Sequence, residues 1–263
     1  MEKLILYCKS YINDVHRAKI LLDSVIKYNT DKIPFYISVP KSDIQIFQNV
    51  LGISDYILIA DEEIDTDNTG WRGQQIVKSQ FWKLNLCDNY INIDSDCFFI
   101  RPFYITDFMY SENIPYTICH EYKSFFEFMD RHPVEYDPYI GFEDERRKIM
   151  NLFGRSGVVY DFGPCPPIWS VKVWKSLFNK YIYPNNLTFS DLIKTVPSEF
   201  TWYGEWLMRD KTIPLIPRGP LFKNYHYKIQ YDYDKLNNYS IELMAKRYMG
   251  IGMQSNFPNE AKY

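Results

Sequence analysis

Two aspartates separated by one residue, Asp94 and Asp96, follow a short apolar segment, 91–93, and precede another, 97–100. Residues i and i+2 of a strand share a face, so the two carboxylates can point to one place. Carboxylates that close repel each other unless a cation or a proton lies between them. A hard divalent ion that carries phosphate oxygens meets this need. Residues 94–96 are therefore a candidate metal–diphosphate site.

The elements that would position these carboxylates alternate between strand and helix. The patterns of apolar residues predict strands over 3–8, 34–39 and 56–60 and helices over 14–28 and 43–51. Such a βαβαβ order predicts a parallel, doubly wound sheet with right-handed crossovers, in which ligands bind beyond the carboxyl ends of the strands. A helix over 74–87 and a strand over 90–93 would then deliver Asp94 to that edge. Further strands are expected over 114–119 and 156–160, and further helices over 146–151 and 171–181.

Composition excludes several classes of protein. The net charge of −3 argues against a general nucleic-acid binder. No apolar segment approaches the roughly 20 residues that span a bilayer. The five cysteines are scattered and form no CxxC pair, which predicts reduced thiols in a cytoplasmic protein. We expect one compact unit over residues 1–263.

Other interpretations of the aspartate pair stay open or fail on single residues. Both carboxylates can simply be solvated or cap a turn. Residues 65–70 resemble the start of an EF-hand loop more closely, but Ile76 occupies the position that needs a bidentate Glu. A phosphatase with an aspartyl nucleophile is a further alternative. Its haloacid-dehalogenase-type motif usually follows the first strand and continues into Thr or Val, whereas here Cys97 follows Asp96.

The chain resembles GT-A-fold glycosyltransferases in its βαβαβ opening, its hydrophobic-Asp-Ser-Asp-hydrophobic motif and a late histidine, His226. The segments Gly70-Trp71-Arg72-Gly73-Gln74-Gln75 and Gly252-Met253-Gln254-Ser255-Asn256 resemble small bacterial transferases of surface-polysaccharide clusters. The resemblance implies an α/β, GT-A fold with a Rossmann-like, mostly parallel central sheet flanked by helices and a smaller acceptor-binding C-terminal part. Residues 1–105 would form the nucleotide-binding half and residues 106–263 the acceptor-binding half.

On the donor side, the resemblance implies a nucleoside-diphosphate sugar bound with Mn²⁺ or Mg²⁺. The metal ligands would be Asp94, Asp96 and His226. The remaining contacts to the nucleotide sugar would come from Tyr7, Lys9, Ser10, Arg72, Lys78 and Ser95.

On the acceptor side, the resemblance favours an inverting transferase, whose base takes a proton from the acceptor hydroxyl, and a retaining mechanism stays open. Glu199 is the preferred base and Glu205 the alternative, although Glu199 equally suits a helix start. Trp202 and Tyr203 would stack on a sugar unless they pack in the core. The acceptor would be a glycan or a lipid-linked acceptor in the cytoplasm, and the protein would contact the inner face of the membrane peripherally. A non-catalytic carbohydrate-binding protein is the alternative outside enzymology.

Overall fold

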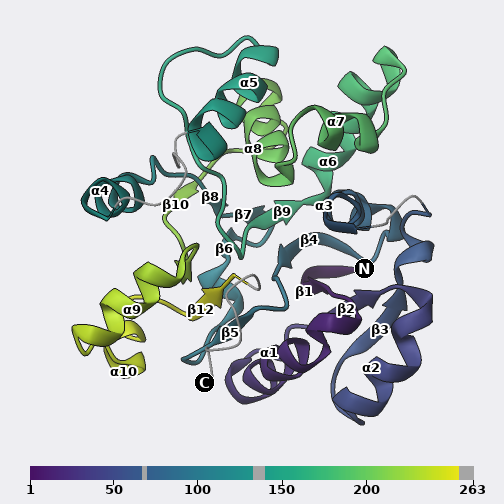
Figure 1. The fold of residues 1–263 in the computed structure, drawn as a ribbon. Helices are drawn as coiled ribbons and strands as arrows, with labels where there is room; N and C mark the ends of the chain where they lie inside the picture. The colour runs from purple at the N-terminus through teal and green to yellow at the C-terminus, as the bar shows by residue number, and fades with distance from the viewer. Residues whose placement is uncertain (67–69, 133–139, 255–263) are drawn as a thin grey trace.

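A computed structural model of the chain describes residues 1–66, 70–132 and 140–254, with a five-stranded sheet at its centre (Figure 1). The strand order is β3-β2-β1-β4-β9. Neighbouring strands among the first four are parallel, and β9 runs antiparallel to β4 at the edge. The strands are β1 (Glu2–Lys9), β2 (Phe35–Val39), β3 (Ile57–Ala60), β4 (Cys87–Asn92) and β9 (Ile168–Ser170).

Helices cover both faces of this sheet (Figure 1), and the apolar side chains on both sides of its strands are buried beneath them. Along β1, Leu4, Leu6 and Cys8 belong to the core beneath α1 (Val15–Tyr28) and α2 (Ile44–Leu51). Ile5 and Tyr7 belong to the core on the opposite face. The helices on that face are α3 (Gly70–Gln80), α5 (Glu145–Leu152), α6 (Val171–Leu177), α7 (Phe189–Thr195) and α8 (Glu199–Asp210).

A second, smaller sheet adjoins the aspartate pair. Its central strand β12 (Gly250–Met253) pairs with β11 (Phe222–Tyr225) and with β5 (Cys97–Phe99), which starts directly after Asp96. The end of the described chain therefore returns beside the segment that carries the aspartates. The remaining elements are β6 (Met109–Ser111), β7 (Ile114–Pro115), β8 (Thr117–Ile118), β10 (Pro217–Arg218), α4 (Lys123–Arg131), α9 (Lys228–Leu236) and α10 (Ile241–Met244).

The structure confirms the α/β class with a mostly parallel central sheet, but it corrects several element boundaries. The helix expected over 74–87 ends at Gln80, and after a 3-10 turn Asn85 adopts a left-handed conformation (φ 52°) that leads into β4. Residues 156–160 form no strand, because Gly154 and Gly157 turn the backbone at φ 74° and 94°. Residues 114–119 split into β7 and β8, which pair with different partners.

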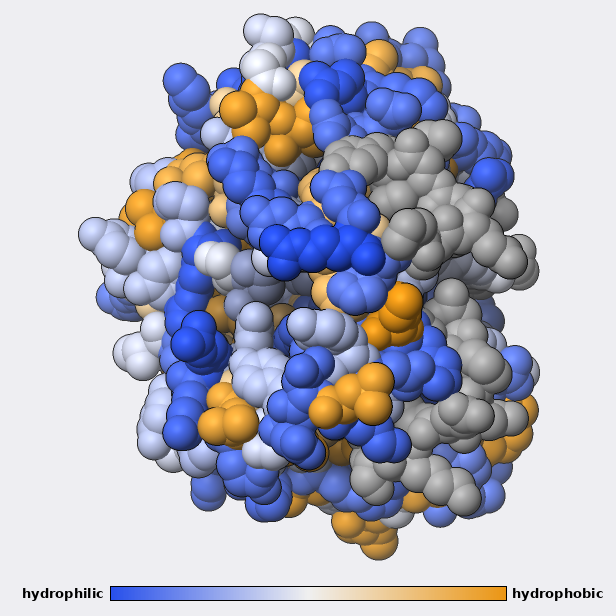
Figure 2. Space-filling view, turned by 60° about the vertical axis from the view of Figure 1, so that its left-hand side comes forward, coloured by the Kyte–Doolittle hydropathy of each residue, from blue (hydrophilic) through white to orange (hydrophobic). Residues whose placement is uncertain are grey.

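The surface on the side of α4, α9 and α10 is largely hydrophilic, and its hydrophobic residues form separate small groups (Figure 2). No helix within the described ranges is long and apolar enough to cross a membrane. The five cysteines carry free thiols, and all but Cys119 are buried.

Candidate active site

A cleft of about 1060 Å³ lies at the carboxyl edge of the main sheet. Its volume is at the upper end of the range typical of ligand pockets. Both halves of the chain line it, because residues 94–96 leave β4 there while α8 and β11 approach from the second half. The lining side chains used below are Lys9, Asp14, Trp71, Gln75, Lys78, Asp94, Ser95, Asp96, Arg146, Asp161, Glu199, Phe200 and His226.

The most distinctive feature of the cleft is a buried lysine between two carboxylates. The Nζ atom of Lys78 lies 2.5 Å from Oδ1 of Asp94 and 3.4 Å from Oε1 of Glu199. Burial alone would lower the pKa of Lys78, but the two carboxylates outweigh burial and raise it, so the ammonium stays charged. Burial raises the pKa of Glu199, and the Lys78 ammonium opposes that shift. Lys78 thus holds residues from opposite walls of the cleft together.

The carboxylates of Asp14, Asp94 and Asp96 surround Ser95. Oγ of Ser95 donates a hydrogen bond to Oδ2 of Asp14 at 3.4 Å. Burial, together with the carboxylates of Asp94 and Asp14, raises the pKa of Asp96 to about 7. Asp14 precedes α1 but makes no capping hydrogen bond to that helix, so its side chain serves the cleft instead. This crowding of negative charge is the property expected of a site for a cation.

The carboxylate oxygens of Asp94 and Asp96 match the chemistry of Mn²⁺ and Mg²⁺ ligands. His226 lines the same cleft, but its Nε2 shares a hydrogen bond with the hydroxyl of Tyr122, and its ring packs against Phe125. Burial lowers the pKa of His226 to about 4, which leaves the neutral imidazole that a metal requires. In the part of the chain that the structure describes, no three His, Cys, Asp or Glu side chains already form a cation site. Asp94, Asp96 and His226 thus line one cleft, and Nε2 of His226 is engaged by Tyr122.

Not all predicted nucleotide contacts reach the cleft. Lys9, Lys78 and Ser95 line it, and Lys9 also forms a buried ion pair with Asp61 at 2.8 Å. Tyr7 does not line the cleft, because its ring is fully buried and stacks on Phe81 while its hydroxyl hydrogen bonds to Ser38.

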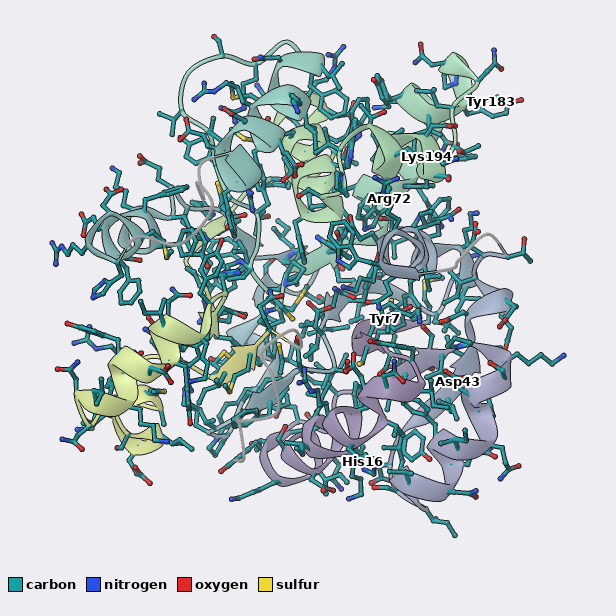
Figure 3. All side chains as sticks on the ribbon, in the orientation of Figure 1. Tyr7, His16, Asp43, Arg72, Tyr183 and Lys194 are labelled. Carbon is teal, nitrogen blue, oxygen red and sulfur yellow. The ribbon has the colours of Figure 1, made fainter. Side chains whose placement is uncertain are left out.

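Ser10 and Arg72 are also outside the cleft lining. Ser10 is buried beneath it. Arg72 is exposed on α3, on the side where Lys194 of α7 lies (Figure 3). Of the predicted donor contacts, Tyr7, Ser10 and Arg72 therefore do not line the cleft, whereas Lys9, Lys78 and Ser95 do.

On the acceptor side, Glu199 lines the cleft and three other predicted residues do not. Glu205 is buried and holds Arg155 through two hydrogen bonds of 2.7 and 2.5 Å, so it cannot serve as the base in this arrangement. Trp202 and Tyr203 are only 2% and 1% exposed. Their side chains point from α8 into the core and cannot stack on a sugar, which corrects the prediction that they bind the acceptor.

Several cleft residues had no assigned role. Trp71 is 63% exposed at the cleft and precedes Gln75 and Lys78 by four and seven residues, so the three side chains share one face of α3. Oε1 of Gln75 is buried and accepts no hydrogen bond from any described residue. That helical spacing was a signal available in the sequence. Gly252, Met253 and Gln254 also line the cleft, while Ser255 and Asn256 lie outside the described residues.

We compared the sequence and the fold of the chain with those of known proteins. A family model described as "Family of unknown function (DUF6492)" matches residues 4–133. No curated protein matches the chain by sequence.

Two solved structures are similar over 98% of this chain. The apo crystal structure of mouse xyloside xylosyltransferase 1 aligns with a TM-score of 0.51 and 8% identity over 100% of its own length. The apo structure of the bifunctional glycosyltransferase WbbM aligns with a TM-score of 0.55 and 10% identity, and this chain spans 46% of it. The chain therefore has a GT-A-like fold shared with glycosyltransferases.

Proposed function

We propose that this protein is a metal-dependent glycosyltransferase that moves a sugar from a nucleoside diphosphate to the hydroxyl of a glycan or lipid-linked acceptor. The single observation that supports this most is the Lys78 bridge between Asp94 and Glu199. It joins a candidate diphosphate site to a candidate base within one cleft of a fold shared with glycosyltransferases. The proposal includes a cytoplasmic location and peripheral contact with the membrane.

On the donor side, Asp94 and Asp96 would hold Mn²⁺ or Mg²⁺. When bound, the ion would offset the negative charge that develops on the departing diphosphate. Lys78 adds a fixed positive charge beside Asp94 and can bind phosphate oxygens directly. His226 would join the metal through Nε2 only after the hydrogen bond of that atom with Tyr122 is broken.

On the acceptor side, Glu199 would take the proton from the attacking hydroxyl. Its raised pKa makes it a better proton acceptor than an ordinary surface carboxylate, and Lys78 favours the charged form that can act as a base. A base on the acceptor side of the sugar is the arrangement that gives inversion at the anomeric carbon.

The direct test measures thermal melting with a panel of sugar nucleotides, each with and without Mn²⁺. At about 100 times its dissociation constant, a true donor should raise the melting temperature by about 5–10 °C. Asp96→Ala should abolish the metal-dependent part of that shift. Asp88→Ala is the control, because Asp88 is a surface aspartate paired with Lys3 away from the cleft. A metal-dependent shift that survives in Asp96→Ala would contradict the metal assignment.

Assays on the same protein distinguish the two alternative functions, a phosphatase and a non-catalytic carbohydrate-binding protein. Release of inorganic phosphate from phosphomonoesters, with no nucleoside diphosphate formed from any sugar nucleotide, would favour an aspartyl-nucleophile phosphatase. If no sugar nucleotide shifts the melting temperature with or without Mn²⁺, a non-catalytic carbohydrate-binding protein becomes the better description.

A further inference from the structure

A second, smaller cavity of about 240 Å³ adjoins the cleft in the second half of the chain. We call it the side pocket, and its lining includes Tyr122, Phe126, Phe142, Arg146, Tyr160 and Asp161. Phe142, Arg146 and Asp161 line both cavities, so the two spaces meet at these residues. A liquid water occupies about 30 Å³, so the side pocket has room for about eight waters, or for one small ring rather than a chain of sugars.

The side pocket opens into the cleft that the candidate base, Glu199, also lines. Gly163 lines the cleft beside Asp161, and a Cβ atom at Gly163 would lie 3.5 Å from Oδ1 of Asp161 and 3.6 Å from the ring of Phe200. Phe200 directly follows Glu199 in α8. A molecule that fills the side pocket can therefore extend past Arg146 and Asp161 toward Glu199.

The charges of the side pocket disfavour an anionic occupant. Arg146 donates from Nε and Nη2 to Oδ1 of Asp161 at 3.2 and 2.9 Å, and Arg147 pairs with Glu143. The fifth charged lining residue, Glu121, pairs with Lys123 at 3.0 Å. Since each cationic side chain of the lining already has a carboxylate partner, a phosphate would gain little there.

The same lining suits a neutral, polyhydroxylated ring. Four aromatic side chains, those of Tyr122, Phe126, Phe142 and Tyr160, line it and supply apolar surface for the C–H groups of a pyranose. Arg146 spends one further N–H on the carbonyl oxygen of Phe142, which together with Asp161 accounts for three of its five donors. The other two can donate to hydroxyl oxygens, and the carboxylates can accept from hydroxyl groups.

We infer that the side pocket binds the terminal sugar of the acceptor, a neutral pyranoside, and presents one of its hydroxyl groups to Glu199. This inference rests on the proposed function, in which the acceptor hydroxyl attacks the donor sugar beside Glu199. It assigns to the acceptor a set of residues other than Trp202 and Tyr203.

The test uses saturation-transfer NMR on the full chain with a panel of neutral methyl pyranosides. Two variants change the side pocket in opposite ways: Tyr160→Ala removes a wall, and Val158→Trp fills the space from its exposed edge. Tyr183→Ala is the matched control, because Tyr183 is 71% exposed at the periphery, far from both cavities (Figure 3). Melting curves confirm that each variant is folded, and nucleoside diphosphate binding with Mn²⁺ is measured on the same samples.

We expect at least one pyranoside to bind the wild type and Tyr183→Ala alike, and to bind both side-pocket variants about ten-fold more weakly. Nucleoside diphosphate binding should be unchanged throughout. Pyranoside binding that both side-pocket variants retain, or no binding of any pyranoside to the wild type, would overturn the inference. A different result would separate the two proposals. If both variants lose pyranoside binding but the wild type binds no nucleotide, the proposed function is overturned and the sugar site is supported.

Discussion

Helix α8 carries two buried glutamates six residues apart, and their surroundings differ. Glu199 contacts Lys78 at 3.4 Å, shares that lysine with Asp94 and lines the cleft. Glu205 forms two short hydrogen bonds with Arg155 and faces the interior. Six residues correspond to about 600° of helix rotation, so the two side chains leave α8 in different directions. Of these two buried glutamates of one helix, only Glu199 thus lines the cleft.

The largest expected effect separates the two glutamates directly. Glu199→Gln should lower the turnover number for sugar transfer by about 10²–10⁴, because it removes a general base while keeping the shape of the side chain. Donor binding, measured by calorimetry, should change little. Glu205→Gln should leave turnover near the wild-type value below its melting temperature. Equal losses of turnover in the two variants would show that the cleft arrangement does not distinguish them.

The next effect concerns the stability that the buried pair of Glu205 and Arg155 contributes. Arg155→Met should lower the free energy of unfolding by about 3 kcal/mol, because it leaves the Glu205 carboxylate buried without its cation. Denaturant melts measure this change. The double variant Arg155→Met with Glu205→Met should recover much of the loss, since no uncompensated charge then remains buried.

A third, smaller effect depends on pH and concerns the ion pair between the two cavities. Burial alone would raise the pKa of Asp161, but Arg146 and His120 outweigh burial and hold that pKa below its ordinary value. The stability from this charged pair is therefore fully present above about pH 4 and is lost as the pH falls below it. Asp161→Asn should lower the free energy of unfolding by about 2 kcal/mol at pH 7. The difference from wild type should shrink in melts below pH 4, and a difference that grows there would contradict the assignment.

The smallest effect compares neighbours on α3. Trp71→Ala should weaken binding of a nucleotide or sugar ligand about five-fold, because it removes an exposed ring at the cleft. Arg72→Ala should leave binding unchanged, since Arg72 does not line the cleft. Calorimetric titrations of both variants measure the difference, and a larger loss in Arg72→Ala would reverse the orientation given to α3.

The first half of the fold was predictable because its elements are marked by local patterns. The apolar periods of residues 3–8 and 14–28 correspond closely to β1 and α1, and the aspartate pair does follow a buried strand, at the carboxyl edge of the sheet. The strand predicted over 156–160 was wrong, because local hydrophobicity does not show whether a partner strand exists. Tyr7, Trp202 and Tyr203 were misassigned for a related reason: an aromatic residue suits a binding site and a core equally well.

The sequence by itself determined which residue types could do chemistry and where β4 would deliver Asp94 and Asp96. Those features follow from neighbours within a few residues along the chain. Tertiary structure decided that Lys78, 16 residues before Asp94 and 121 before Glu199, would join the two. It also decided that Glu199 faces the cleft while Glu205 is buried against Arg155. Such choices depend on how α3 and α8 dock on the sheet, and long-range packing of that kind leaves no local pattern in the chain.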